Sequence, residues 1–372
     1  MASYVIVPSL VQRSFLVRDG DLGGRQVKFL TSTYDSRKKE IAAWSLVGGS
    51  IILIFHFSHG SKLFNLFTFS YFDAESTDDL FSCECRLIID TDVNDLLLYG
   101  GTKFVAAMND GSVRLLEYDE GVIKPMRKYI DVHDSCSCNA LCYNNGKIIS
   151  GSEGGTLVCI DLESNSKEIV SLSMASIRSL ASIARDVFVS AHLDGQICLW
   201  DRRSSRPIFS CRVTDCFQGT TSLATHPAEP NLVGFGTEDG GIGFLDTRRS
   251  SCLLNIVAVS FQLVQSGKLV HFHFHIVAFH PVYPSNFYCA TGKGHLLHLS
   301  VKGSSLSNST SNFNDQSRAN AWLSSSVRSG NTNVTALIDC LTSVSTFSIS
   351  ENGIIACSDN QMITYIDKKY LA

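Results

Sequence analysis

One stretch, Val187 to Ser204, most constrains how this chain can fold. It reads VFVSAHLDGQICLWDRRS, so two short runs rich in β-branched and aromatic residues flank the pair Asp194-Gly195. An Asp-Gly pair between two such runs is a strong hairpin signal, and it predicts a two-residue type I′ turn with positive φ at both central residues. Trp200-Asp201 closes the second run. The stretch therefore predicts a β-hairpin that ends on a Trp-Asp pair.

The same pattern recurs along the chain. The second turn residue falls at positions 111, 155, 195, 240, 294 and 360, and the first three intervals are 44, 40 and 45 residues. A period of about 40–45 residues is typical of the blades of a WD-repeat β-propeller. An early copy, Val27 to Leu46, brings the number of units to seven. The residues that define the repeats are Trp44, Asp110, Gly111, Asp161, Asp194, Gly195, Trp200, Asp201, Asp239, Gly240, Asp246, Asp359 and Asp367.

We therefore predict an all-β fold, a seven-bladed WD-repeat β-propeller that closes into a ring and spans residues 1–372 as a single domain. A four-stranded sheet alone leaves its faces half covered, so the blades must pack on one another around a ring. An N-terminal strand, Tyr4 to Val7 or Ser14 to Val17, is expected to complete the last blade and tie the ends together. Two separate β-domains remain the alternative.

Three stretches within this domain depart from the repeat, namely 48–72, 256–275 and 304–317. The first is interpreted as an inserted hairpin or buried strand pair, or as translated intron sequence, and sequencing the transcript separates these explanations. The third is polar and of low complexity, so it is predicted to be a loop. Beyond it, Ala319, Trp322 and Leu323 follow helical spacing and predict a short helix over Asp315 to Ser326, between the last two blades.

Composition excludes several classes of function. The net charge of −4 argues against a nucleic-acid surface, which normally needs a basic stripe. The most apolar run, Val47 to Phe57, is about half the ~20 residues of a membrane helix, so no span is predicted. Thirteen cysteines are an odd number, and the N-terminus lacks the basic region of a secreted precursor, so reduced and mostly buried thiols are expected. Basic pairs such as Arg202-Arg203 are interpreted as solvated turn charges.

Candidate chemical sites are weak. His271, His273 and His275 alternate and would share a strand face, but no cysteine or carboxylate completes a zinc site, so exposed strand histidines are favoured. The cysteine groups Cys136-x-Cys138-x₃-Cys142 and Cys83-x-Cys85 lack zinc-module spacing and are interpreted as small buried residues. His226 and His280, each before a proline, are expected to hydrogen-bond within their own blades. The sequence thus predicts no catalytic, cofactor-binding or metal site, and no small-molecule substrate.

Two repeats carry a resemblance to a known family. HPAEPNLVGFGTEDGGIGFLDTRR and VAFHPVYPSNFYCATGKGHLLHLS resemble the corresponding repeats of the small WD-repeat nucleoporin family, the forty-three-kilodalton member of the Y-shaped complex in the nuclear pore outer ring. The polar loop before NAWLSS (320–325) and the closing IIACSDNQMITYID resemble its final segments in the same order. The resemblance covers Phe188 to Leu371, about half the chain.

This resemblance implies a non-enzymatic scaffold subunit at the nuclear envelope that supports pore assembly and transport of protein and messenger RNA, and that visits kinetochores in mitosis. The partner it implies is the short-arm helical scaffold nucleoporin. An alternative comes from the same hairpin, because Asp194-x₅-Trp200-Asp201-x-Arg203 resembles the motif by which some propellers bind the adaptor of a cullin-RING ubiquitin ligase. In that alternative the chain is a substrate receptor and Arg203 contacts the adaptor.

Overall fold

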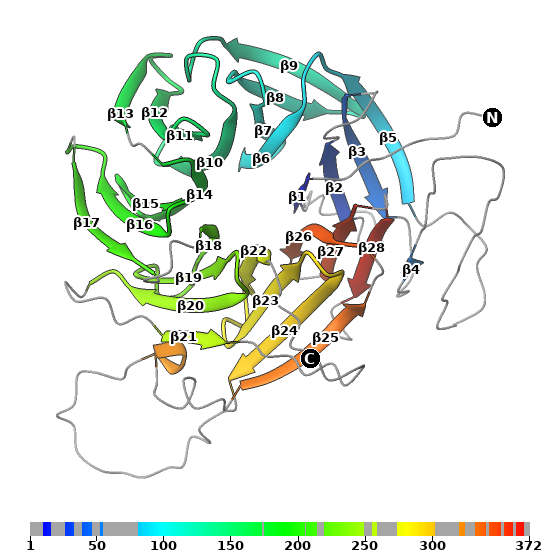
Figure 1. The fold of residues 1–372 in the computed structure, drawn as a ribbon. Helices are drawn as coiled ribbons and strands as arrows, with labels where there is room; N and C mark the ends of the chain where they lie inside the picture. The colour runs from blue at the N-terminus through cyan, green and yellow to red at the C-terminus, as the bar shows by residue number, and fades with distance from the viewer. Residues whose placement is uncertain are drawn as a thin grey trace.

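Seven four-stranded antiparallel sheets make up the fold and stand around a common centre like blades (Figure 1). The structure, a computed structural model, describes residues 10–15, 27–32, 39–46, 53–54, 81–172, 175–204, 206–213, 219–248, 255–258, 274–301, 320–323, 332–339, 342–350, 353–359 and 362–367. The prediction of an all-β, seven-bladed propeller is confirmed. Most of the inserted stretches 48–72 and 256–275, and all of 304–317, lie outside the described residues.

The blades are numbered here by the chain order of their first strands. Blade 1 comprises β1 (Leu10–Phe15), β2 (Val27–Ser32), β3 (Glu40–Leu46) and β5 (Phe81–Ile88), and blade 2 comprises β6 (Val93–Gly100), β7 (Lys103–Met108), β8 (Val113–Asp119) and β9 (Val122–Tyr129). Blade 3 comprises β10 (Cys138–Asn144), β11 (Lys147–Ser152), β12 (Thr156–Asp161) and β13 (Lys167–Leu172), and blade 4 comprises β14 (Ile177–Ala184), β15 (Val187–His192), β16 (Gln196–Asp201) and β17 (Pro207–Arg212). Blade 5 comprises β18 (Thr220–Thr225), β19 (Leu232–Thr237), β20 (Gly241–Asp246) and β21 (Asn255–Ala258). Blade 6 comprises β22 (Phe274–Phe279), β23 (Asn286–Thr291), β24 (His295–Val301) and β25 (Thr332–Asp339). Blade 7 comprises β26 (Val344–Ser350), β27 (Gly353–Ser358), β28 (Met362–Asp367) and β4 (Leu53–Ile54).

The ring closes by packing between sheets. The first strand of each blade lies innermost and contacts the first strand of the next blade, and β26 of blade 7 contacts β1 of blade 1. Side chains reinforce this contact, since Asp95 Oδ2 accepts the backbone N–H of Leu141 at 2.8 Å. Ser222 Oγ likewise accepts the N–H of Val277 at 3.1 Å. These bonds hold blade 2 to blade 3 and blade 5 to blade 6.

The hydrophobic core lies between the blades. Described apolar clusters fill each junction from blades 1 and 2 through to blades 6 and 7. In blade 4, Phe188 and Trp200 face blade 3, whereas Val189 and Leu199 face blade 5. Both faces of a middle strand are therefore buried, which explains why these strands read as continuous apolar runs instead of alternating with polar residues.

The hairpin turns differ from the predicted type. Gly111, Gly195 and Gly240 have φ of 78°, 81° and 88°, but the aspartates before them do not have positive φ. The N–H of Gly195 bonds to the carbonyl of His192, and Ala191 pairs with Ile197. The loops are therefore three-residue loops that end on a left-handed glycine, and the expected type I′ turn is wrong. The aspartates bend the turn through their side chains.

Each turn aspartate accepts a backbone N–H two residues later. The distances from Oδ1 are 2.9 Å for Asp110 to Ser112, 3.1 Å for Asp194 to Gln196 and 3.4 Å for Asp239 to Gly241. Such a bond imitates a backbone turn and is the reason aspartate is frequent in turns. The Asp-Gly pair thus predicted the hairpin correctly. The aspartate contributes a side-chain hydrogen bond and only the glycine has positive φ, whereas the expected turn has positive φ at both residues.

Replacing Gly111 by alanine should destabilise the protein by about 1–3 kcal/mol, the typical cost of a strained backbone position. Its φ is 78°, and an added Cβ would lie 2.5 Å from the carbonyl oxygen of Cys136. Gly100→Ala is the matched control, because nothing lies within 4 Å of a Cβ there. Urea unfolding of both variants measures the difference, and equal stabilities would contradict the expectation.

The closing blade departs from the sequence expectation. The N-terminal strand β1 pairs with β2 as the innermost strand of blade 1 and does not complete blade 7, so that prediction is wrong. Tyr4 to Val7 lies outside the described residues. The fourth strand of blade 7 is β4, whose Ile54 and Leu53 pair with Thr364 and Tyr365 of β28. β4 lies within the atypical stretch 48–72, of which only Leu53 and Ile54 are described.

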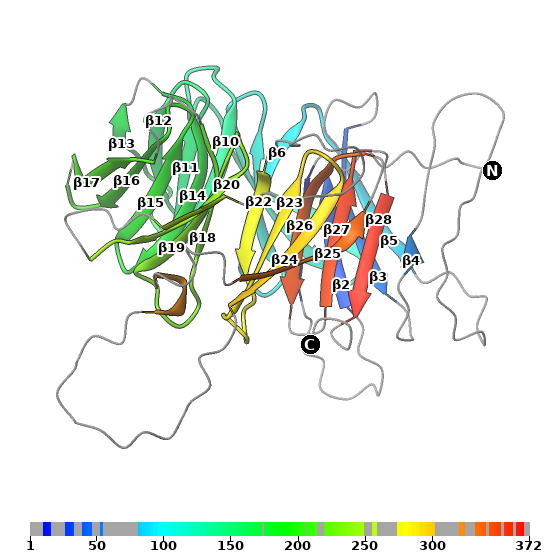
Figure 2. The ribbon, with the colours of Figure 1, turned by 60° about the horizontal axis from the view of Figure 1, so that its bottom comes forward.

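The predicted helix is shorter than expected. Only a 3₁₀ turn, η1 (Ala321–Leu323), is described within Asp315 to Ser326, and residues 315–319 and 324–326 lie outside the described part. It occurs between β24 and β25, inside blade 6, and contacts β20 of blade 5. The expected place between the last two blades is therefore wrong. Figure 2 shows this orange turn at the lower edge of the green blades.

Candidate interaction surface

A hydrogen-bonded chain inside blade 4 links three of the strand residues of the opening hairpin. Trp200 Nε1 donates to Ser190 Oγ at 2.7 Å, and Ser190 Oγ lies 2.8 Å from His192 Nε2. His192 Nδ1 lies 3.4 Å from the carbonyl of Ala175, which can only accept, so Nδ1 carries the proton. Nε2 therefore accepts from the hydroxyl of Ser190. Burial lowers the pKa of His192, which keeps the ring neutral. Trp200-Asp201 thus has a structural role.

The aspartates that end the third strands cap the turns that follow. Asp161, Asp201 and Asp246 each accept the N–H of the residue two positions later, at 2.9, 2.9 and 3.0 Å. A basic side chain also bonds to each, namely Lys147, Arg203 and Arg248. The hydrogen bond from Arg203 lowers the pKa of Asp201 to about 2. These carboxylates are therefore ionised and satisfied within their own blades.

Arg203 lies on the surface, with 73% of its side chain exposed. Its Nε donates to Asp201 Oδ1 at 2.9 Å and its Nη2 to Oδ2 at 2.5 Å. Arg248 makes the same contacts to Asp246 at the end of β20 in blade 5, where Leu245-Asp246 stands in place of a Trp-Asp pair. The Asp-x-Arg arrangement thus has a structural use that needs no adaptor, while Arg203 remains accessible to one.

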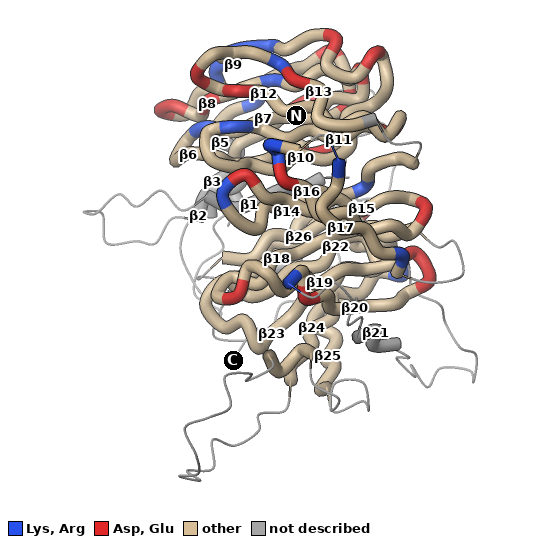
Figure 3. The backbone as a smooth tube through the Cα atoms, turned by 90° about the vertical axis from the view of Figure 1, so that its left-hand side faces the viewer, with Lys and Arg blue, Asp and Glu red and all other residues tan. Residues whose placement is uncertain are grey.

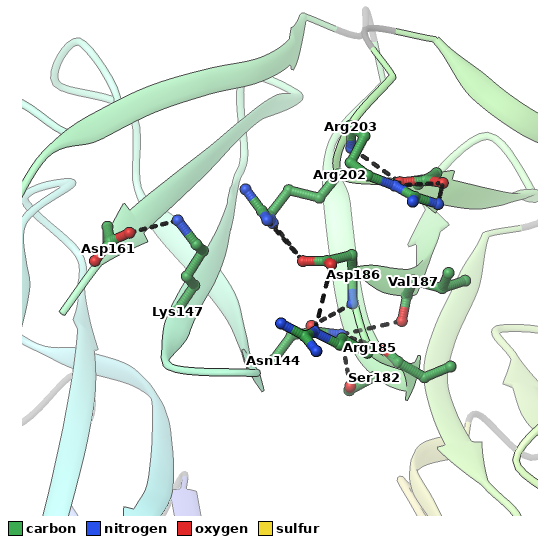
Figure 4. A network of polar contacts seen from close by, with 11 residues as sticks. Asn144, Lys147, Asp161, Ser182, Arg185, Asp186, Val187, Arg202 and Arg203 are labelled. Atoms are coloured by element: carbon green, nitrogen blue, oxygen red, sulfur yellow. Dashed lines mark hydrogen bonds and ion pairs between the residues drawn. The ribbon is translucent and has the colours of Figure 1, made fainter. Parts of the chain in front are cut away.

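A polar network joins blades 3 and 4 on the same edge of the ring (Figure 4). Asn144 Nδ2, at the end of β10, donates to the carbonyl of Ala184 at 2.8 Å, and Asn144 Oδ1 accepts the N–H of Asp186 at 2.9 Å. Asp186 Oδ1 accepts from Arg202 Nε and Nη2 at 2.9 and 2.7 Å. Arg202 is therefore held in an ion pair, and its interpretation as a solvated turn charge is wrong.

This network was missed at the sequence level, although one signal was present. Asp186 adopts φ of 62° in the turn between β14 and β15, a conformation that aspartate tolerates better than most residues. An aspartate at a hairpin turn can therefore be anticipated. Its partner Arg202 follows β16 of the same blade and approaches through the pairing of β15 with β16. Asn144 comes from blade 3, and its approach depends on how the blades pack.

Three further candidate residues lie in the first and last blades. Trp44 pairs with Phe29 as Trp200 pairs with Phe188, but its side chain lies outside the described part. Asp359 is exposed after β27 and donates its N–H to the carbonyl of Ser343. Asp367 pairs with Gly353 at the end of β28, and its side chain is likewise not described.

Both His-Pro histidines bond within their own blades, as expected. His226 Nδ1 accepts the N–H of Glu229 at 2.9 Å, and His280 Nδ1 accepts the N–H groups of Val282 and Tyr283 at 3.1 Å. Burial lowers the pKa of both rings, which favours the neutral form that these bonds require. The two histidines hold the turn between the first and second strands of blades 5 and 6.

Metal-binding candidates do not converge in the part of the chain that the structure describes, where no group of three or more potential ligands lies together. His275 is exposed on β22 and its Nε2 lies 3.1 Å from Ser343 Oγ, whereas His271 and His273 lie outside the described residues. Cys138 and Cys142 are buried, and Cys136 is half-buried. Nine cysteines have described side chains and none of these forms a disulfide bond, while the side chain of Cys83 on β5 is not described. Within the same residues, no helix has the length and hydropathy to cross a bilayer.

The innermost strands of blades 2 to 7 line a central cavity of about 620 Å³. Its wall is mainly polar and includes Asp95, Asn139, Arg178 and Ser179. Several of these groups already serve the blade junctions, since Asp95 accepts the N–H of Leu141 and Ser179 Oγ accepts the N–H of Leu223 at 3.1 Å. The cavity is therefore built chiefly from groups that hold the ring together.

Six of the ten large apolar side chains that are exposed among the described residues lie on the outer strands of four consecutive blades. They lie at the end of β5, in or directly after β9, in β13 and in β17: Ile88, Val122, Met126, Ile130, Ile169 and Ile208. In blade 6 the exposed residues of β25 are Asn333, Thr335 and Ala336, and Val282 and Tyr283 are exposed in the turn between β22 and β23. Clustered exposed apolar groups are typical of surfaces that bind other proteins. The rim of blades 1 to 4 is the candidate interaction surface.

Comparison with known proteins supports the fold and identifies no family for this chain. No protein-family model matches the chain. Among solved structures, a chain in the "Crystal Structure of Mitotic Checkpoint Complex" superposes with a TM-score of 0.61 and 14% sequence identity, over 92% of this chain and 84% of that one. At this identity the likeness concerns fold alone. The chain has a WD40-like β-propeller fold.

Proposed function

We propose that this chain is a non-enzymatic scaffold subunit of the nuclear pore outer ring, at the nuclear envelope and at kinetochores in mitosis. It supports pore assembly and the transport of protein and messenger RNA by binding other outer-ring nucleoporins, among them the short-arm helical scaffold nucleoporin. The observation that carries the proposal is the apolar rim of blades 1 to 4, which offers a wide surface to a protein partner. The resemblance over Phe188 to Leu371 supports the nuclear pore outer ring as the complex to which this scaffold subunit belongs.

Several features support a binding role over catalysis. The buried histidines with lowered pKa values, such as His226 and His280, use their ring nitrogens to hold turns. Asp161, Asp201 and Asp246 are occupied by turn N–H groups and basic side chains. A catalytic acid or base needs a free site for proton transfer beside a substrate. These groups are engaged in building the blades.

Affinity purification of the tagged chain tests the proposal. We expect outer-ring nucleoporins to co-purify at near-stoichiometric amounts, because a scaffold subunit is a permanent member of its complex. Recovery of a cullin adaptor without any nucleoporin would overturn the proposal and favour the substrate-receptor alternative.

That alternative, a substrate receptor of a cullin-RING ligase, rests on the exposed guanidinium of Arg203. Arg203→Ala should leave the free energy of unfolding nearly unchanged, because exposed ion pairs contribute little. In the scaffold proposal the variant retains its nucleoporins and acquires no other defect. Loss of adaptor binding in this folded variant would instead support the alternative. Arg248→Ala, which removes the same contact in blade 5, is the control.

A further inference from the structure

We propose that the central cavity binds an extended peptide segment that places one anionic side chain, a carboxylate or a phosphoryl group, against Arg178. The site goes beyond the proposed function, because it lies in the centre of the ring and not on the rim of blades 1 to 4. It is built from six side chains, one from each of blades 2 to 7, which are called the bulge ring below. The members of the bulge ring are Asn94, Asn139, Arg178, Thr221, His275 and Ser345.

Each member of the bulge ring occupies a β-bulge at the same place in its blade. It is the second residue of the innermost strand, where the register with the next strand shifts. The hairpin turns lie at this end of the blades, since the N–H groups of Leu193 and Glu238 bond to the carbonyls of Ser176 and Gly219, directly before innermost strands. A bulge leaves one residue outside the ladder and re-aims its side chain. All six side chains line the central cavity.

The residue that follows the bulge has a different role. Asp95, Ser179 and Ser222 each come directly after a member of the bulge ring. Each accepts a backbone N–H from the next blade, at 2.8, 3.1 and 3.1 Å. The bulge therefore lets one side chain hold the junction between blades while the preceding side chain lines the cavity.

Arg178 differs from the other members of the bulge ring because its guanidinium is not engaged. It is exposed, and it has no hydrogen bond or ion pair within the part of the chain that the structure describes. A guanidinium carries five N–H donors in a planar fork that matches the two oxygens of a carboxylate or phosphoryl group. Arg178 can therefore bind such a group without breaking a contact that holds the blades.

The charge of the cavity wall favours an anionic occupant. The innermost strands of blades 2 to 7 contain only two Asp, Glu, Lys or Arg residues, namely Asp95 and Arg178. In Figure 3 the innermost strands β18, β22 and β26 accordingly carry neither colour of charge. Asp95 is half-buried and already accepts the N–H of Leu141. Arg178 is thus the charged group that the cavity offers to a ligand.

The neutral members of the bulge ring favour a peptide over a free anion. Asn94 Nδ2 donates to the carbonyl of Cys138 at 2.9 Å. Thr221 Oγ1 donates to the carbonyl of Gly236 at 3.1 Å. Their donors are therefore used within the blades, and their oxygens remain as acceptors. A peptide brings backbone N–H donors for these oxygens beside its anionic side chain, whereas a free polyphosphate brings only more acceptors and more charge than one guanidinium balances.

The size of the cavity suits part of a peptide. Its volume of about 620 Å³ lies within the range of about 300–1,000 Å³ that is usual for ligand pockets. The bulge ring surrounds the cavity with polar groups from six blades, so a segment that enters it meets acceptors on several sides of Arg178.

The first test selects peptides from a phage-displayed library of short random sequences, against the full chain and against Arg178→Glu. We expect the unmodified chain to enrich sequences with aspartate or glutamate at one fixed position, and Arg178→Glu to lose them. Enrichment of no sequence, of sequences without an acidic residue, or of the same acidic sequences by both proteins would overturn the site.

The second test measures one selected peptide by fluorescence anisotropy in three versions, with its acidic residue, with phosphoserine and with alanine at that position. We expect an anionic version to bind at least tenfold more tightly than the alanine version. Tighter binding of phosphoserine identifies a phosphoryl group as the anion, and tighter binding of the acidic residue identifies a carboxylate. Equal binding of all three versions would overturn the site.

Two variants and a control place the binding in the cavity. Arg178→Ala removes the guanidinium, and Thr221→Glu retains Arg178 but adds a carboxylate to the bulge ring, so each should weaken binding of the anionic peptide at least tenfold. Arg127→Ala removes an exposed arginine from β9, outside the cavity, and should bind like the unmodified chain. Thermal unfolding checks that the three variants fold.

Unchanged affinity in either folded cavity variant would overturn the site and leave the scaffold role standing. Absence of outer-ring nucleoporins from the purified chain would overturn the scaffold role, and it would not alter these peptide measurements.

Discussion

Replacing Trp322 by alanine should lower the free energy of unfolding by about 3–5 kcal/mol, the usual cost of removing a large buried aromatic side chain. Trp322 is only 1% exposed and stacks on Phe244 with ring centroids 4.6 Å apart. It also contacts Phe279 and Phe287 in the cluster between blades 5 and 6. Nothing else in the described structure fills that space, so the deletion leaves a cavity that the rigid blades cannot collapse.

Trp322→Phe separates the two parts of this effect. The indole Nε1 donates to the carbonyl of Pro284 at 2.9 Å, and Asn320 Nδ2 donates to Glu229 Oε1 at 2.8 Å beside it. Phenylalanine retains most of the volume but loses the indole bond, so we expect a smaller loss of about 1–3 kcal/mol. Urea unfolding followed by circular dichroism measures both variants. A loss below about 1 kcal/mol for the alanine variant would show that η1 does not hold blades 5 and 6 together.

Lowering the pH from 7 to 5 should destabilise the protein, with His133 alone contributing about 2 kcal/mol. His133 is buried, and burial lowers its pKa to about 4. Ser150 Oγ donates to the carbonyl of Val158, so His133 Nε2, 3.0 Å from the same oxygen, is the protonated nitrogen. Nδ1 has no partner, and a proton there would leave a charge buried without compensation.

The direction of this change in stability with pH follows from the pKa of His133 in the folded and in the unfolded chain. In the unfolded chain a histidine has a pKa of about 6.5, so on acidification the unfolded state takes up the proton first. Stability is therefore lost as the pH falls from about 6.5 toward the folded value of about 4, and it is unaffected above neutrality. His192, His226, His280 and His298 also have lowered pKa values because of burial, so they act in the same direction.

His133→Gln isolates the contribution of one ring, because glutamine does not titrate and can still donate to Ser150. We expect the difference in unfolding free energy between pH 7 and pH 5 to be smaller by about 2 kcal/mol in this variant. Urea unfolding at the two pH values provides the comparison. The same pH dependence in both proteins would contradict the assignment of His133 as a buried neutral group.

The blade hairpins and their number were predictable because they depend on local interactions. The Asp-Gly pairs, the period of the turns and the apolar runs of residues such as Val187 to Ala191 act within a few residues of one another. The same holds for His226 and His280, whose bonds reach two or three residues along the chain. The type of turn was missed because the carboxylate of Asp110 or Asp194 bends the loop, which frees the first turn position from positive φ.

The candidate surface could not be predicted in the same way. Nothing in the stretch Val122 to Tyr129 distinguishes an outer strand with exposed Met126 from a buried one until its neighbours are known. The contact of Asp186 with Asn144 likewise requires the relative placement of two blades. These features depend on contacts between segments about 40 residues apart, which the repeat period implies only in outline.

By itself the sequence determined the all-β class, the hairpin repeat and the seven blades. Each of these follows from backbone preferences and from burial on both faces of a strand, which are properties of short segments. The tertiary structure alone decided that Leu53 and Ile54 complete blade 7, that Trp322 fills the junction of blades 5 and 6, and that β9 faces solvent. The physical reason is that strand pairing and packing between distant segments are selected by the closure of the whole ring.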